Sequence, residues 1–439
     1  MDVFQAWLEE RNIDDVEAFV PDMAGSARGK VVPAEKFGGP MKIPEAIFGQ
    51  TISGDYVDNE HNVEDRDMQL VPDSKTLRPV PWATDPAASV FVDCYRSDGK
   101  QVETSPRSVL RNVLDKYEAQ GWIPVVAPEV EFYLLSAHSD PNAEAEPPEG
   151  RLGWTEGARQ PYSIDSMNDF DPFINSLYEY CEAQNIIIDT LSQEMGPAQF
   201  EINFLHGNAL DLADQVFLFK RTVREVAIEH EMHATFLAKP MAEEAGSALH
   251  VHQSIVDNEG NNIFSGKNGK ATDSFYGYLG GLQRYMPEAL LIFAPYVNSY
   301  RRFLNPWASP INLEWAVDNR TVGLRVPDAE PVNRRIENRL AGSDVNPYLV
   351  LAATLACGYL GMTEDLKPTE PAEGSAYKEE YSLHRHIFAA IEALRDSAAM
   401  RNMLGANFVD LYCKVKDDEY KEFQEIITPW EREILMFNV

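Results

Sequence analysis

The sequence predicts an α+β protein with a small β-rich first unit and a larger second unit. Up to about residue 103, apolar or alternating runs are broken by Gly, Pro and Asp, which indicates short strands joined by turns. These runs are Val16–Asp22, Lys30–Val32 and Ser89–Tyr95. Thr104-Ser105-Pro106 then offers a cap and a first-turn proline for a helix over Arg107–Gln120. We therefore divide the chain into units 1–103 and 104–439.

The second unit is expected to combine helices with strands. Apolar residues recur at helical spacing over Asp171–Gln184, Ala209–His230 and Ser274–Tyr285. The apolar stretch Tyr348–Met362 is shorter than the ~20 residues that cross a bilayer, so it predicts a buried core helix. No membrane-spanning segment is expected.

The charge balance limits the classes of partner. The chain of 439 residues has 38 Lys and Arg against 70 Asp and Glu, a formal net charge of −32. This excess of acid argues against nucleic acid or an anionic membrane as a partner. It favours cations, including metal ions and amines, or it reflects only solubility in a salty cytoplasm. Both interpretations stay open.

The sequence also favours a cytoplasmic location. The four cysteines include no CxxC pair, so neither a disulfide scaffold nor a zinc knuckle is indicated, and a reducing compartment is expected. Met1–Val20 has acidic residues and no basic segment before an apolar stretch, which is not the pattern of a signal peptide.

Five predicted strands each carry one apolar face and one charged or imidazole face. Residues two apart on a strand share a face, so Glu129 and Glu131 in Pro128–Leu134 stand side by side, ~6.6 Å apart. The same alternation recurs in four other stretches. It places Glu201 on the polar face of Gln199–Phe204, His250 and His252 on that of Leu249–His252, Arg335, Glu337 and Arg339 on that of Arg335–Leu340, and Arg325 on that of Thr321–Val326.

One such strand alone is typical of a solvated outer face. Five together concentrate carboxylates, imidazoles and arginines, the groups that bind divalent cations and phosphate. Carboxylates gathered on one concave sheet repel each other unless cations neutralise them. The sequence therefore predicts a site for two or more Mg²⁺ or Mn²⁺ ions and an anionic substrate held by the arginines.

With these residues assembled, the chain resembles the glutamine synthetase family from about Asp22 to its end. The motifs that carry the resemblance follow in family order: DMAGSARGK, PEVEFYLL, EMGPAQFE, GSALHVHQS, NSYRR, DNRTVGLRVP and RRIENR. The resemblance implies a β-grasp-like N-terminal domain and a larger catalytic domain with a curved antiparallel sheet. It also implies a homo-oligomer, a dodecamer of two stacked hexameric rings, with the active-site cavity between adjacent subunits.

The resemblance further implies a role for each matching residue. One metal ion would be held by Glu131, Glu194 and Glu201, and a second by Glu129, His250 and Glu337. Glu194 rests on the resemblance alone. Nucleotide and phosphate contacts match His252, Ser254, Arg325 and Arg335, and contacts to glutamate match Gly246, Arg302 and Arg339. The catalytic residues implied are Arg302, Glu194 and Arg320, the last at the transferred phosphoryl group. For His252 and Ser254, a structural hydrogen-bonding role remains an alternative.

The family chemistry explains these residue types. A carboxylate is a poor electrophile, so ATP first phosphorylates the side chain of L-glutamate, and an amine then displaces phosphate from the γ-glutamyl phosphate. Two or three Mg²⁺ or Mn²⁺ ions and the arginines spread the charge during phosphoryl transfer.

The chain departs from glutamine synthetases proper at two carboxylates. Ala308 stands where a loop Glu would take a proton from ammonium, and Phe48–Ser53 lacks the usual Asp-Gly-Ser-Ser segment. Ala245 also replaces the Asn that usually precedes Gly246. These changes disfavour ammonia and make room for a larger amine. The motifs as a whole resemble most the branch that ligates glutamate to putrescine, within a family whose ligases for methylamine, ethylamine or isopropylamine look alike at this level.

Several alternatives remain at the level of sequence. The chain is a polyamine or monoamine ligase, a glutamine synthetase that uses other groups with ammonia, or a non-catalytic structural relative, which the six retained metal ligands disfavour. The distal ammonium of a diamine would meet Asp55, Asp58 or Glu60 in the loop Gly54–Glu64, or Trp307 by a cation–π contact, unless the loop is merely solvated. Glu364–Pro368 lacks the regulatory Tyr, so adenylylation is not expected there.

Overall fold

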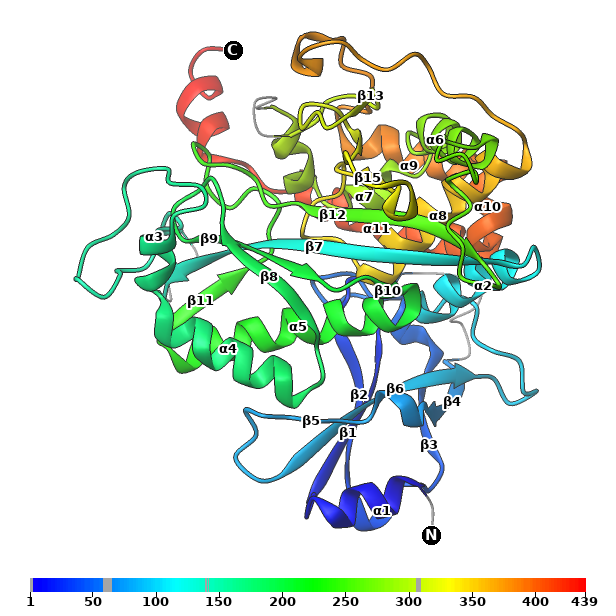
Figure 1. Cartoon of the computed structure of the whole chain (residues 1–439). Coiled ribbons are helices and arrows are strands. Elements are labelled where there is room, and N and C mark those ends of the chain that lie inside the picture. The colour runs from blue at the N-terminus through cyan, green and yellow to red at the C-terminus, as the bar shows by residue number, and fades with distance from the viewer. Residues whose placement is uncertain (1–2, 58–64, 139, 141, 305–308) are drawn as a thin grey trace.

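The computed structural model describes residues 3–57, 65–138, 140, 142–304 and 309–439 (Figure 1). The strands fall into two sheets. The first sheet has the order β2-β1-β6-β4-β3, with β5 added beside β6, and every pair is antiparallel except β1–β6. Its strands are β1 (Asp15–Pro21), β2 (Ala27–Pro33), β3 (Met41–Pro44), β4 (Asp67–Pro72), β5 (Arg78–Pro79) and β6 (Ala87–Tyr95).

The second sheet has the order β13-β14-β15-β12-β7-β9-β8, with β10 and β11 also paired to β7. Its pairs are antiparallel except β13–β14. The strands are β7 (Trp122–Ser136), β8 (Ile188–Gln193), β9 (Gln199–Phe204), β10 (Gly207–Asn208), β11 (Met232–Thr235), β12 (Leu249–Asp257), β13 (Trp315–Val317), β14 (Leu324–Val326) and β15 (Ile336–Asn338).

Helices surround the second sheet. The predicted helices are confirmed within two residues as α2 (Pro106–Glu118), α4 (Asp171–Ala183), α5 (Ala209–Glu229), α6 (Asp273–Tyr285) and α8 (Pro347–Thr363). The others are α1 (Val3–Glu10), α3 (Ile164–Asn168), α7 (Leu290–Phe293), α9 (Ile387–Asp396), α10 (Ala398–Leu404) and α11 (Ala406–Gln424). Short helical turns are η1 (Ala34–Lys36), η2 (Glu45–Gly49), η3 (Ser74–Thr76), η4 (Val297–Leu304), η5 (Pro331–Asn333), η6 (Ala376–Lys378) and η7 (Glu431–Leu435). Within the described residues, no helix is long and apolar enough to span a membrane.

Two predicted strands are shorter in the structure. β14 begins only at Leu324, because Thr321 enters a turn in which its backbone N–H donates to Asn319 Oδ1 over 2.9 Å. β15 begins at Ile336, since the preceding residues follow the turn η5. The first unit also contains α1, β3, β4 and β5, which the sequence did not reveal.

The apolar face of β7 forms the core. Val130, Phe132 and Leu134 are fully buried, and the Phe132 ring lies 6.0 Å from that of Phe219 on α5. In Figure 1, α4 and α5 lie below β7, and the first unit lies below them. Because side chains alternate along a strand, Glu129 and Glu131 face the opposite side of the sheet. The helices thus leave the polar face of β7 available for a site.

A buried arginine joins the two units. Arg107, at the start of α2, is 1% exposed and donates to Asp214 on α5 over 2.9–3.1 Å. It also donates to Asp93 over 2.6 Å and to Asp73 over 2.9 Å, both in the first unit. The relative placement of the units therefore depends on a charge network.

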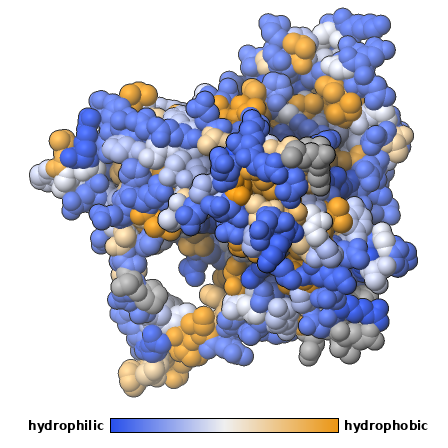
Figure 2. Space-filling view, turned by 90° about the horizontal axis from the view of Figure 1, so that it is seen from below, coloured by the Kyte–Doolittle hydropathy of each residue, from blue (hydrophilic) through white to orange (hydrophobic). Residues whose placement is uncertain are grey.

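The face of the molecule seen from below is largely hydrophilic, in agreement with the high content of acidic residues (Figure 2).

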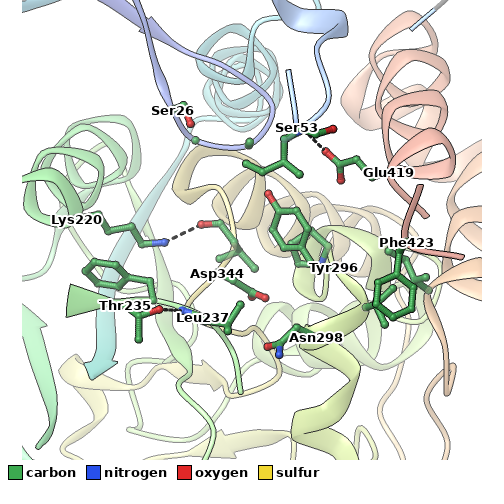
Figure 3. Close-up of a pocket in the computed structure, with 18 of the residues that line it drawn as sticks. Ser26, Ser53, Lys220, Thr235, Leu237, Tyr296, Asn298, Asp344, Glu419 and Phe423 are labelled. Carbon is green, nitrogen blue, oxygen red and sulfur yellow. Dashed lines mark hydrogen bonds between the residues drawn. The ribbon is translucent and has the colours of Figure 1, made fainter. Parts of the chain in front are cut away.

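A cavity of about 840 Å³ lies between the first unit, α5, η4 and α11. Figure 3 shows Lys220 and Asp344 pointing into it from the large unit, with Ser53 at its edge. Lys220 Nζ donates to the carbonyls of Ser343 and Val345 over 2.5 and 2.9 Å. Ser53 Oγ donates to Glu422 on α11 over 2.6 Å, which fastens the segment before the loop 54–64 to the large unit.

Candidate active site

The strand register lines up the polar residues across the second sheet. Glu131 on β7 pairs with Glu201 on β9, and Glu129 pairs with His250 on β12. One step further, His252 pairs with Glu337 on β15, and Glu337 pairs with Arg325 on β14. Because paired residues of adjacent strands share a face, the structure gathers the side chains that the alternation singles out.

Two groups of these side chains are close enough to share a metal ion. Glu129, His250 and Glu337 form one group, and Glu131, Glu201 and His250 form the other, each with ligand atoms within 4.8 Å of one another. His250 Nδ1 lies 3.4 Å from Glu129, 3.8 Å from Glu201 and 3.9 Å from Glu337. The groups correspond to the two ligand sets expected from the sequence, except that His250 belongs to both and Glu194 to neither.

Burial and like charges raise three of the carboxyl pKa values. Burial and the nearby charge of Glu194 raise the pKa of Glu131 to about 8. Burial raises the pKa of Glu194 to about 7, and burial together with Glu129 raises the pKa of Glu201 well above its usual range. The protein alone therefore holds protons among these carboxyls near neutral pH.

Two other carboxylates stay ionised. Burial raises the pKa of Glu129, but hydrogen bonds from His250 and His252 outweigh this effect and lower it. For Glu337, burial is outweighed by Arg339 and the two histidines, which lower its pKa to about 2. Burial, with Arg339 nearby, lowers the pKa of His250, so its imidazole is neutral at pH 7 and able to bind a metal. Carboxylates in contact with the neutral imidazole of His250 are a donor set that fits Mg²⁺ or Mn²⁺.

Arginines border these groups. Glu337 accepts from Arg325 over 2.8 Å and from Arg339, and Arg325 also donates to Asp318 over 2.6 Å. Arg302 on η4 is 3% exposed and donates to the carbonyl of Leu340 over 3.0 Å. Burial lowers the pKa of Arg302, and the Nε atoms of Arg302, Arg325 and Arg339 are buried without a partner in the described part of the chain. These guanidinium groups can bind the anionic groups of a substrate.

The other predicted residues occupy the border of the site. Arg320 is exposed between β13 and β14 and acts on Glu194 only through its charge. Glu194 follows β8, and its backbone N–H donates to the carbonyl of Gln199 over 2.8 Å. Gly246 packs on Arg302, since a Cβ at position 246 would lie 2.5 Å from Arg302 Cγ. Glycine is therefore required at 246 by the approach of this arginine.

A cavity of about 440 Å³ adjoins the ionised Glu129. His252, Ser254 and Arg335 line it together with Glu129, whereas Arg325 is not among its lining residues. His252 Nε2 lies 2.9 Å from Glu129 Oε1, and Arg335 Nε donates to His252 Nδ1 over 3.2 Å. These hydrogen bonds hold the imidazole between an anion and a cation, at the edge of this cavity.

The structure adds contacts that the sequence analysis missed. The carboxylate of Glu131 accepts from the backbone N–H of Ala248 over 2.7 Å and from Gln199 Nε2 over 3.2 Å. Gln199 shares the face of Glu201, so the alternation could have revealed it. No pattern marked Ala248, whose contribution is a backbone group, or Asp318, which lies in a turn. Ala308, Trp307, Asp58 and Glu60 lie outside the described residues, and Asp55 is exposed.

Comparisons with known proteins show the family to which the chain belongs. The family model for the catalytic domain of glutamine synthetase matches residues 103–435. The γ-glutamylputrescine synthetase PuuA of Escherichia coli K12 is 34% identical over 97% of this chain and 92% of its own length. A glutamate–isopropylamine ligase of Pseudomonas sp. is also 34% identical, over 97% of this chain and 95% of its own. A glutamine synthetase of Halobacterium salinarum is 29% identical over 97% of this chain and 94% of its own length.

Solved structures agree as well. The structure of apo GmaS without ligand superposes with a TM-score of 0.85 at 28% identity over 100% of both chains. A complex of GmaS with ADP gives a TM-score of 0.83 at 28% identity over 99% of both chains. On the evidence of its motifs, its mixed α/β fold and these matches, the chain belongs to the glutamine synthetase family and is an ATP-dependent glutamate–amine ligase.

Proposed function

We propose that the enzyme joins the γ-carboxylate of L-glutamate to putrescine or a related polyamine, with ATP as co-substrate and γ-glutamyl phosphate as intermediate. The observation that carries the proposal is the loss of both carboxylates expected around ammonium, at Ala308 and in Phe48–Ser53. The 34% identity to a γ-glutamylputrescine synthetase, against 29% to a glutamine synthetase, supports it.

The metal ligands proposed are Glu131, Glu194 and Glu201 for one ion and Glu129, His250 and Glu337 for the second. Bound Mg²⁺ or Mn²⁺, in two or three sites, would neutralise phosphate charge during transfer. The carboxyls with raised pKa values would lose their protons as the cations bind, because a metal ligand must be deprotonated. The clustering of Glu129, His250 and Glu337 within 4.8 Å of one another supports the second set, and that of Glu131 and Glu201 with His250 supports two members of the first.

The remaining roles are proposed from the family motifs. We propose that Arg302, Arg339 and Gly246 hold glutamate, since Arg302 is packed against Gly246 and acts on Glu131 through its charge. His252, Ser254, Arg325 and Arg335 would hold the nucleotide, and three of these four line one cavity. Arg320 would stabilise the transferred phosphoryl group from its exposed position. Of the three acidic residues considered in the loop 54–64, Asp55 is the one that the structure describes, and we propose it as a contact for the distal ammonium of a diamine.

We also propose that the chain is cytoplasmic and assembles as a dodecamer of two hexameric rings, with domains 1–103, β-grasp-like, and 104–439. Sedimentation of the purified protein tests the assembly. A dodecamer of 49.4 kDa chains is expected, and a monomer at working concentration would contradict it.

The acceptor is tested by measuring phosphate release with glutamate, ATP and Mg²⁺ or Mn²⁺ while the amine is varied. Putrescine, isopropylamine, methylamine and ammonia are compared at equal concentration of the free amine. We expect the highest kcat/KM with putrescine and no turnover when glutamate is omitted. Fast turnover with ammonia alone would overturn the proposal.

A small monoamine is the second candidate acceptor. It is supported by the identity to the isopropylamine ligase, which equals that to the putrescine enzyme. Highest kcat/KM with isopropylamine or methylamine would select it, and mass spectrometry of the γ-glutamyl amide would identify the product in either case.

A further inference from the structure

The turn that follows β8 holds an unusual backbone conformation beside the site. Ala198 has a positive φ of 50°, which an L side chain rarely adopts, and it is fully buried. A Cβ at Gly196 would overlap the hydroxyl of Tyr133, so the turn packs on β7 as closely as its backbone allows. Glu194, a proposed metal ligand, begins this turn. A turn in this conformation needs partners that hold it in place.

Gln199 is one such partner, and it contacts three parts of the site. Its side chain is 1% exposed, and its Oε1 accepts from the backbone N–H of Gly196 over 2.9 Å. Its Nε2 donates to Glu131 Oε2 over 3.2 Å and to the carbonyl of Gly246 over 3.1 Å. One amide therefore links a proposed metal ligand, the turn that carries another, and the glycine of the proposed glutamate pocket.

Glu156 holds the same turn from the other side. It lies in the long segment between β7 and α3, and its Oε2 accepts from the backbone N–H of Ala198 over 2.9 Å and from Gln193 Nε2 over 3.2 Å. Its Oε1 accepts from Ser166 Oγ over 2.9 Å. Gln193 also donates to the carbonyl of Gly196 over 3.2 Å. The carboxylate thus fixes both ends of the strained turn.

We propose that Gln199 and Glu156 are positioning residues for the metal and glutamate sites. Gln199 orients Glu131 and keeps it in register with Gly246 and the turn, and Glu156 holds the turn so that Glu194 stays beside Glu131. The inference rests on the proposed metal ligands. Both residues act through the groups that they hydrogen-bond, and partners of metal ligands that act in this way change affinity by about 10–100-fold when they are removed.

The first test compares Gln199→Met with Gln184→Met. Gln184 is a matched control, because it is also 1% exposed and donates two hydrogen bonds, to Tyr180 O and Thr222 Oγ1, away from the site. Each variant replaces the side-chain amide of a buried glutamine with the apolar side chain of methionine. Mn²⁺ binding to the metal-free full-length protein is measured by titration calorimetry, without ATP or amine, so the readout is independent of turnover.

For Gln199→Met we expect Mn²⁺ affinity to fall about 10–100-fold. We also expect KM for glutamate to rise while KM for ATP stays unchanged, since Gly246 and not the nucleotide cavity loses a partner. Gln184→Met should lower the melting temperature without changing the Mn²⁺ affinity or the KM for glutamate. Equal Mn²⁺ affinity in Gln199→Met and wild type would overturn the inference. Failure of the wild type itself to bind Mn²⁺ would instead overturn the proposed metal site.

Glu156 is tested with a conservative and a truncating variant. In Glu156→Gln, the amide oxygen still accepts from Ala198 N–H, so we expect most of the Mn²⁺ affinity to remain. Glu156→Ala leaves that N–H without an acceptor and removes one of the two acceptors of Gln193 Nε2, so Mn²⁺ affinity should fall and KM for glutamate should rise. If Glu156→Ala matched the wild type in both constants, or if Glu156→Gln failed as badly as Ala, the proposed role of this carboxylate would be wrong.

Discussion

His252 Nε2 lies 2.9 Å from Glu129 Oε1, on the strand next to that of the carboxylate. This contact, with the one from His250, keeps Glu129 ionised among carboxyls that hold protons. The site therefore combines anionic and protonated carboxyls in one small volume. Its state of protonation, and its response to cations, must change across the physiological pH range.

The first prediction concerns pH and the metal-free protein. The pKa of Glu131 is about 8 and that of Glu194 about 7, against an ordinary value of 4.5, so between pH 4.5 and 8 these two carboxyls bind more protons in the folded state than in the unfolded state. The free energy of unfolding should then fall as pH rises through this window. Glu129 and Glu337, whose pKa values are lowered, lose their contribution only below pH 4.5. The lowered pKa of His250 reduces the trend below pH 6.5, and the pKa of Lys220, lowered to about 7, reduces it above pH 7.

Calorimetry in EDTA from pH 5 to 8.5 checks this fall in melting temperature. A parallel series with Mn²⁺ should show the opposite dependence, because ionised carboxylates bind the cation more tightly as protons leave. A metal-induced increase in melting temperature that is the same at pH 5.5 and pH 8 would contradict the prediction.

The second prediction concerns removal of one crowded carboxylate. Burial and the neighbouring carboxylates raise the pKa of Glu201, and Glu201→Gln removes a group that is costly to ionise there, so the metal-free protein should be as stable as the wild type or more so. The loss of a proposed ligand should abolish stabilisation by Mn²⁺ and lower kcat at least ~10²-fold. Thermal melting with and without Mn²⁺ measures both effects. Glu179→Gln, on the exposed surface of α4, is the control and should change neither.

The third prediction concerns the link between the units. Arg107→Met leaves the buried Asp214 without its cation, while Asp73 and Asp93 keep Arg111, and the loss costs about 3–5 kcal/mol of the free energy of unfolding. Denaturant unfolding measures it. Arg284→Met removes an exposed arginine that pairs with Glu288 four residues on, so it should cost less than about 0.5 kcal/mol. Equal losses from both variants would argue against the buried network.

The fourth prediction concerns Gly246. In Gly246→Ala, the new Cβ would meet Arg302 Cγ at 2.5 Å and the carbonyl of Ala238 at 2.7 Å, so Arg302 must move. We expect KM for glutamate to rise about tenfold or more, as for a misplaced binding group, with KM for ATP unchanged. Gly39→Ala, where the nearest atom is Lys36 O at 3.4 Å, is the control. Steady-state kinetics with both substrates varied would reveal an equal rise in both KM values, which would contradict the prediction.

The parts predictable from the sequence are those governed by a regular period. The alternation along β7 and β9 identified the face on which Glu129, Glu131 and Glu201 meet. Helical spacing located α5, and the apolar stretch Tyr348–Met362 located α8, each within two residues. β3, β4 and β5 escaped notice because they are short and each ends in a proline, so no alternation can build up.

The contacts that complete the site could not be predicted in the same way. The backbone N–H of Ala248 reaches Glu131 only because the chain before β12 passes beside β7, and a backbone group leaves no mark in a sequence. Glu156 lies in a Gly- and Pro-rich segment, where a lone acidic residue looks like any solvated one. Such contacts depend on tertiary placement, which periodicity does not encode.

The pairing of β12 with β7 and β15 also limits how this enzyme can change over time. Leu249 and Val251 point into the core, with 1% and 0% exposure, while the intervening histidines point to the acidic face. Inserting or deleting a single residue here would exchange the two sets of side chains. The imidazoles would then point into the hydrophobic core, and the aliphatic side chains would point to the acidic face. Relatives should therefore tolerate many replacements in this segment yet keep its length constant, with gaps in their alignments confined to the connecting loops.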